Sequence, residues 1–314
     1  MKEKTAQKLL LKVKSDYELI AEDFDRTRDK IKDGFTVFDK YLKPGKQLNH
    51  KLTIADIGCG NGRLLKHLSS LNPKPDYQYI GIDTSKKLIE IARGKYQNLP
   101  NTRFIQGDML AIPLPDSSLD LIFNIRAFHH IPSKKLQLKA LSEAIRTLKN
   151  GGRIIITVWN LWQWRTKHLI IKSFLNFILS FGQYAPNDTF IKWGRKTQRY
   201  YHGFTPSELK KLIHKSGLVL EEMFGLAKDT KTPILKGHDI VIIARKPGTH
   251  TLSLASPFHQ WMKCRFWTLF LIKLNYQINN YSLRLLTQRG SLNPLRIKIL
   301  KSSFKIPAST FRME

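Results

Sequence analysis

Three short stretches of the sequence combine glycines and carboxylates in a pattern suited to binding a nucleoside. The first, ADIGCGNGR, places an acid two residues before a G-x-G-x-G loop, while GID and GDM each place an acid after an apolar run. Glycine lets a backbone approach a ligand closely, and a carboxylate accepts hydrogen bonds from amines and hydroxyl groups. The candidate binding residues are Asp56, Gly58, Cys59, Gly60, Gly62, Asp83, Asp108 and Met109, with Asn124 further along the chain.

The three acids suit three different parts of one ligand. Asp56 can reach a cationic amine, and Asp83 can accept hydrogen bonds from ribose hydroxyl groups. Asp108 can bind an adenine amino group while Met109 packs on the ring. A dinucleotide fingerprint would need G-x-G-x-x-G, but position 63 is arginine, so no cradle for a pyrophosphate is expected. The pattern predicts a pocket for an adenosine that bears an amino acid.

A second group of reactive side chains lies in the run QRYYHGF, where Arg199, Tyr200, Tyr201 and His202 are consecutive. An arginine fork binds a carboxylate bidentately, and an aromatic ring can stack on an unpaired base. The same residues could instead pack an insertion against a sheet. Two interpretations therefore stand side by side, core filling and the wall of a pocket for an anion.

Other reactive side chains are few and equally open to interpretation. The paired His129 and His130 could be satisfied core residues or part of a site. Cys59, inside the glycine loop, is better explained as a small residue close to the backbone than as a nucleophile. With Cys264 as the only other cysteine, neither a disulfide framework nor a metal cluster is expected. A reducing compartment, hence a cytoplasmic location, fits this content.

The elements that must position these residues alternate between strand and helix from about residue 52 to 158. Apolar runs such as LTIADIG, YQYIGID and GRIIITVW are typical of buried strands, and helical patterns separate them. Strands that alternate with helices of this length form parallel βαβ units with right-handed crossovers. The sequence therefore predicts an α/β fold built on a doubly wound, Rossmann-like sheet.

The alternation stops near residue 159 and divides the chain into parts. We expect a helical entry segment over residues 1–50, an α/β domain over 51–247 and a basic, partly helical extension over 248–314. Within the α/β domain, residues 160–204 form an insertion after the fifth strand that begins with an apolar, helical segment.

The balance of charge indicates a polyanionic partner. The chain has 53 Lys and Arg against 24 Asp and Glu, a formal net charge of +29. Nucleic acid or an anionic membrane surface would neutralise such a surplus. The apolar runs at residues 169–181 and 266–272 are shorter than the roughly 20 residues of a spanning helix, so no transmembrane segment is expected. The N-terminus lacks the apolar run and cleavage site of a signal peptide.

The glycine loop and the three acids, each at a strand end and in this order, resemble the motifs of class I S-adenosylmethionine (SAM)-dependent methyltransferases. The resemblance covers roughly residues 52–160 and 204–246. It implies a seven-stranded methyltransferase sheet and SAM as the cofactor. The cofactor would then be the ligand that the glycines, the acids, Met109 and Asn124 bind.

Two further stretches, YELIAEDFDRTR and QRYYHGF, look like those of the tRNA wobble-uridine carboxymethyl methyltransferases. That family methylates the carboxylate of 5-carboxymethyluridine at the wobble position of the anticodon. The resemblance implies catalytic roles for Arg28, His130, Arg199 and His202, and substrate contacts for Tyr17, Tyr200 and Tyr201. This chain departs from the family after its Thr-Arg pair, where an aromatic and proline-rich stretch is missing, and in its C-terminal extension.

Methylation of a carboxylate makes modest chemical demands. The group is already ionised near neutral pH, so no general base is needed. The enzyme must place oxygen, methyl carbon and sulfur in line, which is catalysis by proximity and orientation. An arginine can hold the carboxylate while one oxygen stays free to react.

The partners follow from the charge and from the resemblance. The basic extension and the insertion would bind tRNA phosphates with release of counterions. Eukaryotic members of the family work with a small zinc-binding activator, so a protein partner is possible. Membrane-surface association is the rival role for the basic segments. It belongs with an alternative function, a quinone or lipid methyltransferase of the ubiquinone and menaquinone type. A third hypothesis is a non-catalytic RNA-binding subunit.

Overall fold

The structure is a computed structural model that describes residues 1–28, 35–42, 51–73, 75–163 and 165–248. The predicted basic extension lies outside these residues except at its first position.

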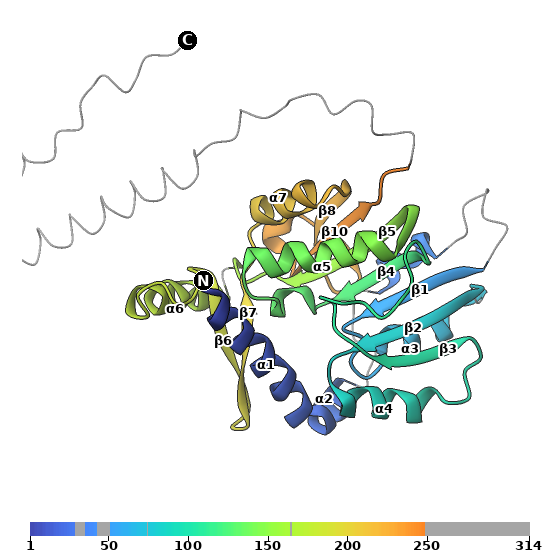
Figure 1. The fold of residues 1–314 in the computed structure, drawn as a ribbon, viewed down its shortest axis with the longest axis horizontal. Helices are drawn as coiled ribbons and strands as arrows, with labels where there is room; N and C mark the ends of the chain where they lie inside the picture. The colour runs from blue at the N-terminus through green and yellow to red at the C-terminus, as the bar shows by residue number, and fades with distance from the viewer. Residues whose placement is uncertain (29–34, 43–50, 74, 164, 249–314) are drawn as a thin grey trace, which may run out of the picture. The chain divides into compact units, whose positions relative to one another are not determined.

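One mixed sheet forms the centre of the fold, with strand order β3-β2-β1-β4-β5-β10-β8-β9 (Figure 1). Its strands are β1 (Leu52–Ile57), β2 (Tyr77–Asp83), β3 (Thr102–Gln106), β4 (Leu119–Ile125), β5 (Leu148–Trp159), β8 (Val219–Ala227), β9 (Thr230–Thr232) and β10 (Asp239–Arg245). The first five pair in parallel, whereas β10 runs antiparallel to both β5 and β8. The predicted doubly wound fold is confirmed, with the short β9 as an eighth strand where seven were expected.

The order of the strands places the ligand-binding crevice. It reverses between β1 and β4, because the chain passes from β1 to β2 and β3 on one side and then returns to β4 on the other. In an open α/β sheet a ligand binds at such a switch point, outside the carboxyl ends of the strands. The glycine loop and the predicted acids lie at this edge, at the ends of β1, β2 and β3 or directly after them.

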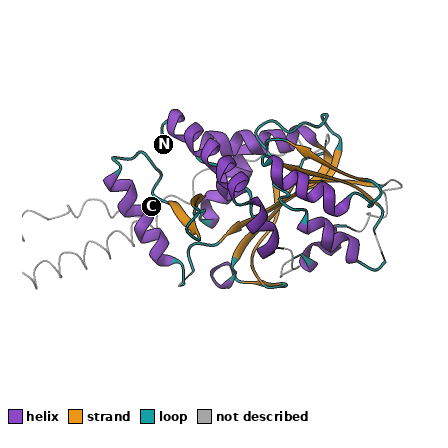
Figure 2. Cartoon of the chain, turned by 90° about the horizontal axis from the view of Figure 1, so that it is seen from below, coloured by secondary structure: helices purple, strands orange, loops and turns teal. Residues whose placement is uncertain are grey.

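Helices cover both faces of the sheet (Figure 2). On one face α5 (Lys134–Thr147) and α7 (Pro206–Ser216) bury leucines against apolar residues of β1, β4, β5 and β10. On the other face lie α3 (Arg63–Ser70), α4 (Lys86–Tyr96) and the 3-10 helix η1 (Thr36–Tyr41). Two short 3-10 helices, η2 (Phe128–His130) and η3 (Ile234–Lys236), follow β4 and β9. The sheet is thereby buried on both faces, as a parallel sheet requires.

The N-terminal helices and the insertion meet beside the carboxyl edge of the sheet (Figure 1). The N-terminal helices are α1 (Glu3–Leu19) and α2 (Ala21–Arg28). The insertion supplies α6 (Lys167–Leu179) and an antiparallel hairpin of β6 (Asp188–Trp193) and β7 (Thr197–His202). The hydroxyl of Thr197 on β7 donates to Asp16 Oδ1 on α1, at 2.6 Å.

The insertion confirms one expectation and adds an element that we did not predict. Its apolar segment is helical, as expected, but the hairpin that carries the four consecutive polar and aromatic residues was not foreseen. None of the helices in the described ranges is long and apolar enough to cross a membrane.

Candidate functional site

A cavity of about 860 Å³ opens at the carboxyl ends of β1, β2, β3 and β4. Residues of α1, α2, α5 and β7, the turn after β8 and the start of β10 also line it. A volume of this size suits a cofactor together with part of a second ligand. The residues predicted from the sequence that line it are Tyr17, Arg28, Asp56, Gly58, Cys59, Gly60, Asp83, Asp108, Met109, His130, Arg199 and Tyr201. Gly62, Asn124, Tyr200 and His202 were also predicted, and the structure does not bring them to the lining.

The glycine loop after β1 is pressed against the turn after β4. Gly58 has φ +82°, and a Cβ atom there would lie 2.3 Å from the Cβ of Ala127. Its N–H donates to the carbonyl of Ile82 at 2.7 Å, which ties the loop to β2. Cys59 is buried, and burial raises the pKa of its thiol well above the usual range. A thiol held protonated is a poor nucleophile, which agrees with a packing role.

Two of the predicted acids sit deep in the cavity, beside the glycine loop. Asp83 accepts the N–H of Gly60 at 2.9 Å and that of Ser85 at 2.9 Å, so the backbone fixes both of its oxygens. Asp56 is 2% exposed, and its Oδ2 accepts the hydroxyl of Tyr79 at 2.8 Å. Burial raises the pKa of Asp83 and raises that of Asp56 to about 7. A cation placed beside Asp56 would relieve this unfavourable burial of charge.

The end of β3 supplies the third acid and its neighbour. Asp108 Oδ1 accepts the N–H of Leu110 at 2.9 Å, which fixes the turn. The thioether of Met109 lies 3.9 Å from Nδ2 of Asn124, and Asn124 is 4% exposed. Asn124 therefore stands behind the lining and positions Met109. Gly62 also lies behind the lining, where it packs against Tyr96. A Cβ atom at this position would lie 2.6 Å from the tyrosine ring, so the close packing requires glycine.

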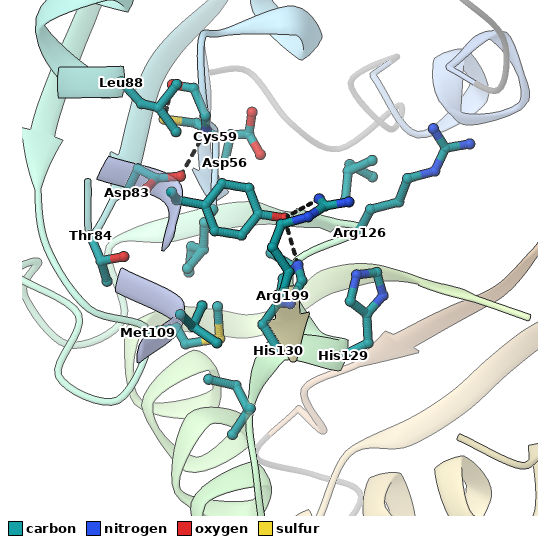
Figure 3. Close-up of a pocket in the computed structure, with 18 of the residues that line it drawn as sticks. Asp56, Cys59, Asp83, Thr84, Leu88, Met109, Arg126, His129, His130 and Arg199 are labelled. Carbon is teal, nitrogen blue, oxygen red and sulfur yellow. Dashed lines mark hydrogen bonds between the residues drawn. The ribbon is translucent and has the colours of Figure 1, made fainter. Parts of the chain in front are cut away.

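At the other end of the cavity a hydrogen-bonded chain links β7, α1 and η2 (Figure 3). His130 Nδ1 lies 2.7 Å from the carbonyl oxygen of Tyr200, and because a carbonyl only accepts, the proton is on Nδ1. His130 Nε2 then accepts the hydroxyl of Tyr17 at 2.8 Å, and that hydroxyl accepts Arg199 NH1 at 3.1 Å. Burial lowers the pKa of His130 to about 3. The histidine is thus neutral and its tautomer fixed.

Arg199 is a buried cation without a carboxylate partner in the described part of the chain. It is 5% exposed, and within the same residues its Nε has no hydrogen-bond partner. No carboxylate forms an ion pair with it among the residues that the structure describes. Its guanidinium lies over the rings of Trp193 and Tyr201, at 4.5 and 5.2 Å from their centroids. Aromatic faces position an arginine but leave its charge available to an anion.

The alternate residues of β7 have a different environment. His202 donates from Nδ1 to Asp188 Oδ1 at 2.7 Å and from Nε2 to Glu208 Oε1 at 3.0 Å. The hydroxyl of Tyr200 donates to the same Asp188 oxygen at 2.7 Å. Burial alone would lower the pKa of His202, but the two carboxylates outweigh burial and raise it to about 9. The resemblance implied a substrate contact for Tyr200 and a catalytic role for His202. The structure places both in a network that joins β7 to β6 and α7, outside the cavity lining.

Two arginines of the cavity were missed in the sequence. Arg63 begins α3 directly after the glycine loop, and Arg126 follows β4. Burial and the neighbouring Arg126 and Arg28 lower the pKa of Arg63 to about 10. Burial and the neighbouring Arg199 and Arg126 likewise lower the pKa of Arg28. Arginine at position 63, which rules out a dinucleotide fingerprint, was itself a signal that could have pointed to this cluster.

Aromatic rings complete the wall beside Arg199. Tyr201 stacks on Trp159 with centroids 4.9 Å apart and planes at 15°, and it lies 4.6 Å from the ring of His130. His129 Nδ1 accepts the backbone N–H of Trp159 at 3.1 Å, and burial keeps the pKa of His129 well below its usual value. His129 is therefore a satisfied buried histidine that also lines the cavity.

The chain is similar in sequence to known methyltransferases. Residues 54–152 match a family model described as a methyltransferase domain. The tRNA (carboxymethyluridine(34)-5-O)-methyltransferase of Schizosaccharomyces pombe is 31% identical over 194 residues, which are 62% of this chain and 72% of that protein. A tRNA (carboxymethyluridine(34)-5-O)-methyltransferase of Mus musculus is 33% identical over 147 residues. The match spans 47% of this chain but only 20% of the mouse protein.

Solved structures share the fold at lower identity. A SAM-dependent methyltransferase from Methanosarcina mazei has a TM-score of 0.51 and 23% identity, over 64% of this chain and 95% of its own. A putative methyltransferase of Haloferax volcanii, solved in complex with the Trm112 methyltransferase activator, has a TM-score of 0.51 and 17% identity. It covers 76% of this chain and 99% of that one.

Proposed function

The chain belongs to the SAM-dependent methyltransferase family that includes the fission-yeast tRNA (carboxymethyluridine(34)-5-O)-methyltransferase, and from this premise we propose that it methylates the carboxylate of a modified wobble uridine in tRNA. SAM is the cofactor of this family.

The residues at the glycine loop fit SAM. Asp56, whose burial raises its pKa to about 7, calls for a cation, which the amino group of the cofactor provides. Asp83 would accept hydrogen bonds from the ribose hydroxyl groups, and Asp108 with Met109 would hold the adenine. Arg63, close enough to lower the pKa of Asp56, takes the carboxylate of the cofactor. When bound, SAM supplies an electrophilic methyl group on its sulfonium.

The observation that carries the proposal is the uncompensated charge of Arg199. A buried guanidinium without a carboxylate partner is costly, and an anionic ligand removes that cost. The neighbouring Tyr17 and His130 are neutral and fixed by hydrogen bonds, so they shape the pocket without adding charge. A planar carboxylate matches the arginine fork. The stacked wall of Tyr201 and Trp159 suits an unpaired base beside it.

The same geometry explains why no general base is supplied. His130 is the nearest candidate, but its Nε2 already accepts a hydrogen bond and burial lowers its pKa to about 3. A carboxylate acceptor needs no proton removed. The residues therefore act by orientation: Arg199 holds the acceptor and Tyr17 holds Arg199.

The proposal is tested by methyl transfer from labelled SAM. The acceptors are tRNA that contains 5-carboxymethyluridine, the same tRNA without the modification, and a lipid extract. Because the Haloferax neighbour was solved with an activator, each assay is run with and without an added Trm112-type subunit. We expect the label in a uridine ester that alkali releases.

Two results would contradict the proposal. Label in another nucleoside would keep RNA as the substrate and exclude the carboxylate mechanism. Label in lipid alone would show that the acceptor is not RNA, and the basic segments would then serve a membrane surface.

A further inference from the structure

The cavity holds more positive charge than two carboxylates, one on the acceptor and one on the cofactor, would neutralise. Besides Arg199, its lining includes Arg28, Arg63 and Arg126. Of these three, Arg126 alone has an ion-pair partner in the described part of the chain, namely Asp239. Each of the others has its pKa lowered by burial and by neighbouring arginines. Like charges gathered out of water destabilise one another, so this region calls for an anion of its own.

The backbone of Arg126 is held in a conformation that its side chain does not favour. Its φ is +56°, in the left-handed region that costs a residue with a Cβ about 1 kcal/mol. Its N–H donates to both the carbonyl and the hydroxyl oxygen of Thr157, each at 3.0 Å. The next residue, Ala127, packs directly against Gly58, so a residue with a Cβ atom could not replace this glycine without a clash. Strain that the surroundings fix in this way is typical of a functional position.

The guanidinium of Arg126 is anchored on one side and open on the other. Nε and NH2 both donate to a single oxygen, Asp239 Oδ2, at 2.9 and 2.7 Å. The Asp239 side chain is 3% exposed, whereas that of Arg126 is 31% exposed. Since a guanidinium has five N–H donors, most of them stay available to a ligand. An arginine oriented by a buried carboxylate and open toward a cavity is suited to bind a phosphate.

The lining near Asp239 continues to an exposed and basic rim. Lys228, in the turn between β8 and β9, and His238, just before β10, both line the cavity and are both exposed. A small free anion could bind inside the cavity without contacting these exposed residues. A sugar-phosphate backbone that enters the cavity from outside would pass along it.

We propose that Arg126, held by Asp239 and flanked by Arg28, binds a phosphate group that adjoins the acceptor nucleoside. This inference rests on the proposed function, because the phosphate belongs to the RNA strand that carries the acceptor carboxylate. Arg199 and Arg126 then bind two different anions of one nucleotide. The enzyme consequently prefers a nucleotide to the corresponding nucleoside, and Arg126 contributes to binding more than to the methyl transfer.

Direct binding tests the subsite without any acceptor chemistry. Uridine 3′,5′-bisphosphate and uridine are titrated by calorimetry, at fixed salt and with S-adenosylhomocysteine present. The proteins are the wild type, Arg126→Gln, Arg126→Lys and Arg153→Gln. The last is a matched control, because Arg153 is paired with Glu221 and does not line the cavity. Thermal unfolding of each variant confirms that it is folded.

The wild type and Arg153→Gln are expected to bind the bisphosphate at least about tenfold more tightly than uridine. Arg126→Gln should lose most of this preference. Arg126→Lys should keep part of it, because lysine retains the positive charge but lacks the planar guanidinium that binds a phosphate through two hydrogen bonds. An unchanged preference in Arg126→Gln would overturn the subsite. So would a wild type that binds both ligands equally.

Methylation separates this inference from the proposed function. If wild-type enzyme methylates carboxymethyluridine and its bisphosphate with equal kcat/KM, the function stands and the subsite fails. If no carboxymethyluridine acceptor is methylated while Arg126→Gln still weakens bisphosphate binding, the function fails and the phosphate site stands.

Discussion

The two faces of strand β7 carry buried cations that the protein treats in opposite ways. Both ring nitrogens of His202 form hydrogen bonds with carboxylates, those of Asp188 and Glu208, so neither nitrogen remains available to a ligand. Arg199 is as deeply buried, but among the described residues its side chain contacts a tyrosine hydroxyl and aromatic faces and no carboxylate. A buried charge that the fold compensates is a structural element, because removing one partner leaves the other unpaired. A buried charge left uncompensated is better explained by a ligand.

The largest expected effect is loss of activity in Arg199→Gln. We expect kcat/KM for the acceptor to fall by about 100-fold or more, because the charge-assisted hydrogen bonds to the carboxylate are lost. SAM affinity should stay within about twofold of the wild type, since the residues proposed to bind the cofactor lie at the strand ends. Steady-state kinetics and SAM titration measure the two quantities. An equal loss of SAM binding would show that Arg199 supports the fold, and Arg153→Gln is again the matched control.

His202→Gln should instead reduce stability. Breaking a buried charge network by removing one member costs about 3 kcal/mol, while the folded fraction should keep nearly full activity. Urea unfolding measures the first quantity and turnover at low temperature the second. Loss of activity without loss of stability would place His202 in the catalytic site after all.

The pH dependence of stability sharpens the same contrast. The folded pKa of His202 is about 9, above the unfolded value of 6.5. The protonated form is therefore favoured by folding, and its stabilisation is complete below pH 6.5 and lost as the pH rises through about 9. Wild-type unfolding free energy should fall across this window. In His202→Gln the fall should be smaller, and an equal fall in both proteins would contradict the assignment.

A smaller effect is expected for Tyr17→Phe. The hydroxyl orients Arg199 and completes the hydrogen bonding of His130, so its removal should lower kcat about tenfold. The pH–rate profile should keep its shape between pH 6 and 8, because the pKa of His130 stays far below this range. A new ionisation near neutral pH would mean that the histidine transfers a proton.

The smallest effect concerns a buried acid at the other end of the cavity. Burial raises the pKa of Asp56 to about 7, above its unfolded value of 3.8. Ionising this group in the folded, cofactor-free protein therefore costs stability, and this cost grows as the pH rises from 3.8 to about 7 and is complete above pH 7. Asp56→Asn should raise its unfolding free energy at pH 8 by roughly 1–2 kcal/mol while weakening SAM binding. No gain in stability would indicate that another cation already compensates Asp56.

The structure brings together more of the residues predicted to bind the cofactor than of those predicted to bind the acceptor. Glycines and acids at the ends of successive strands are local signals, and the parallel topology alone brings Asp56, Asp83 and Asp108 together. The run at residues 199–202 belongs to a hairpin that was not foreseen, and a strand sends alternate side chains to opposite faces. Adjacency in sequence therefore grouped four residues that the hairpin separates into two pairs.

The arginines that sequence reasoning missed show a second limit. Arg126 carries no motif of its own, and its partner Asp239 lies on β10, more than a hundred residues away. Only the pairing of β10 with β5 brings the two together. Long-range ion pairs of this kind are set by tertiary structure, so a local pattern could not reveal which arginines would be neutralised.

The most direct measurement of the central claim compares an acceptor carboxylate with its amide. Binding of 5-carboxymethyluridine and 5-carbamoylmethyluridine nucleotides is measured on wild type and Arg199→Gln, with S-adenosylhomocysteine bound. If Arg199 binds the carboxylate, the wild type prefers the acid by about tenfold or more and the variant loses that preference. A preference that persists in Arg199→Gln would place the carboxylate on another residue and contradict the account.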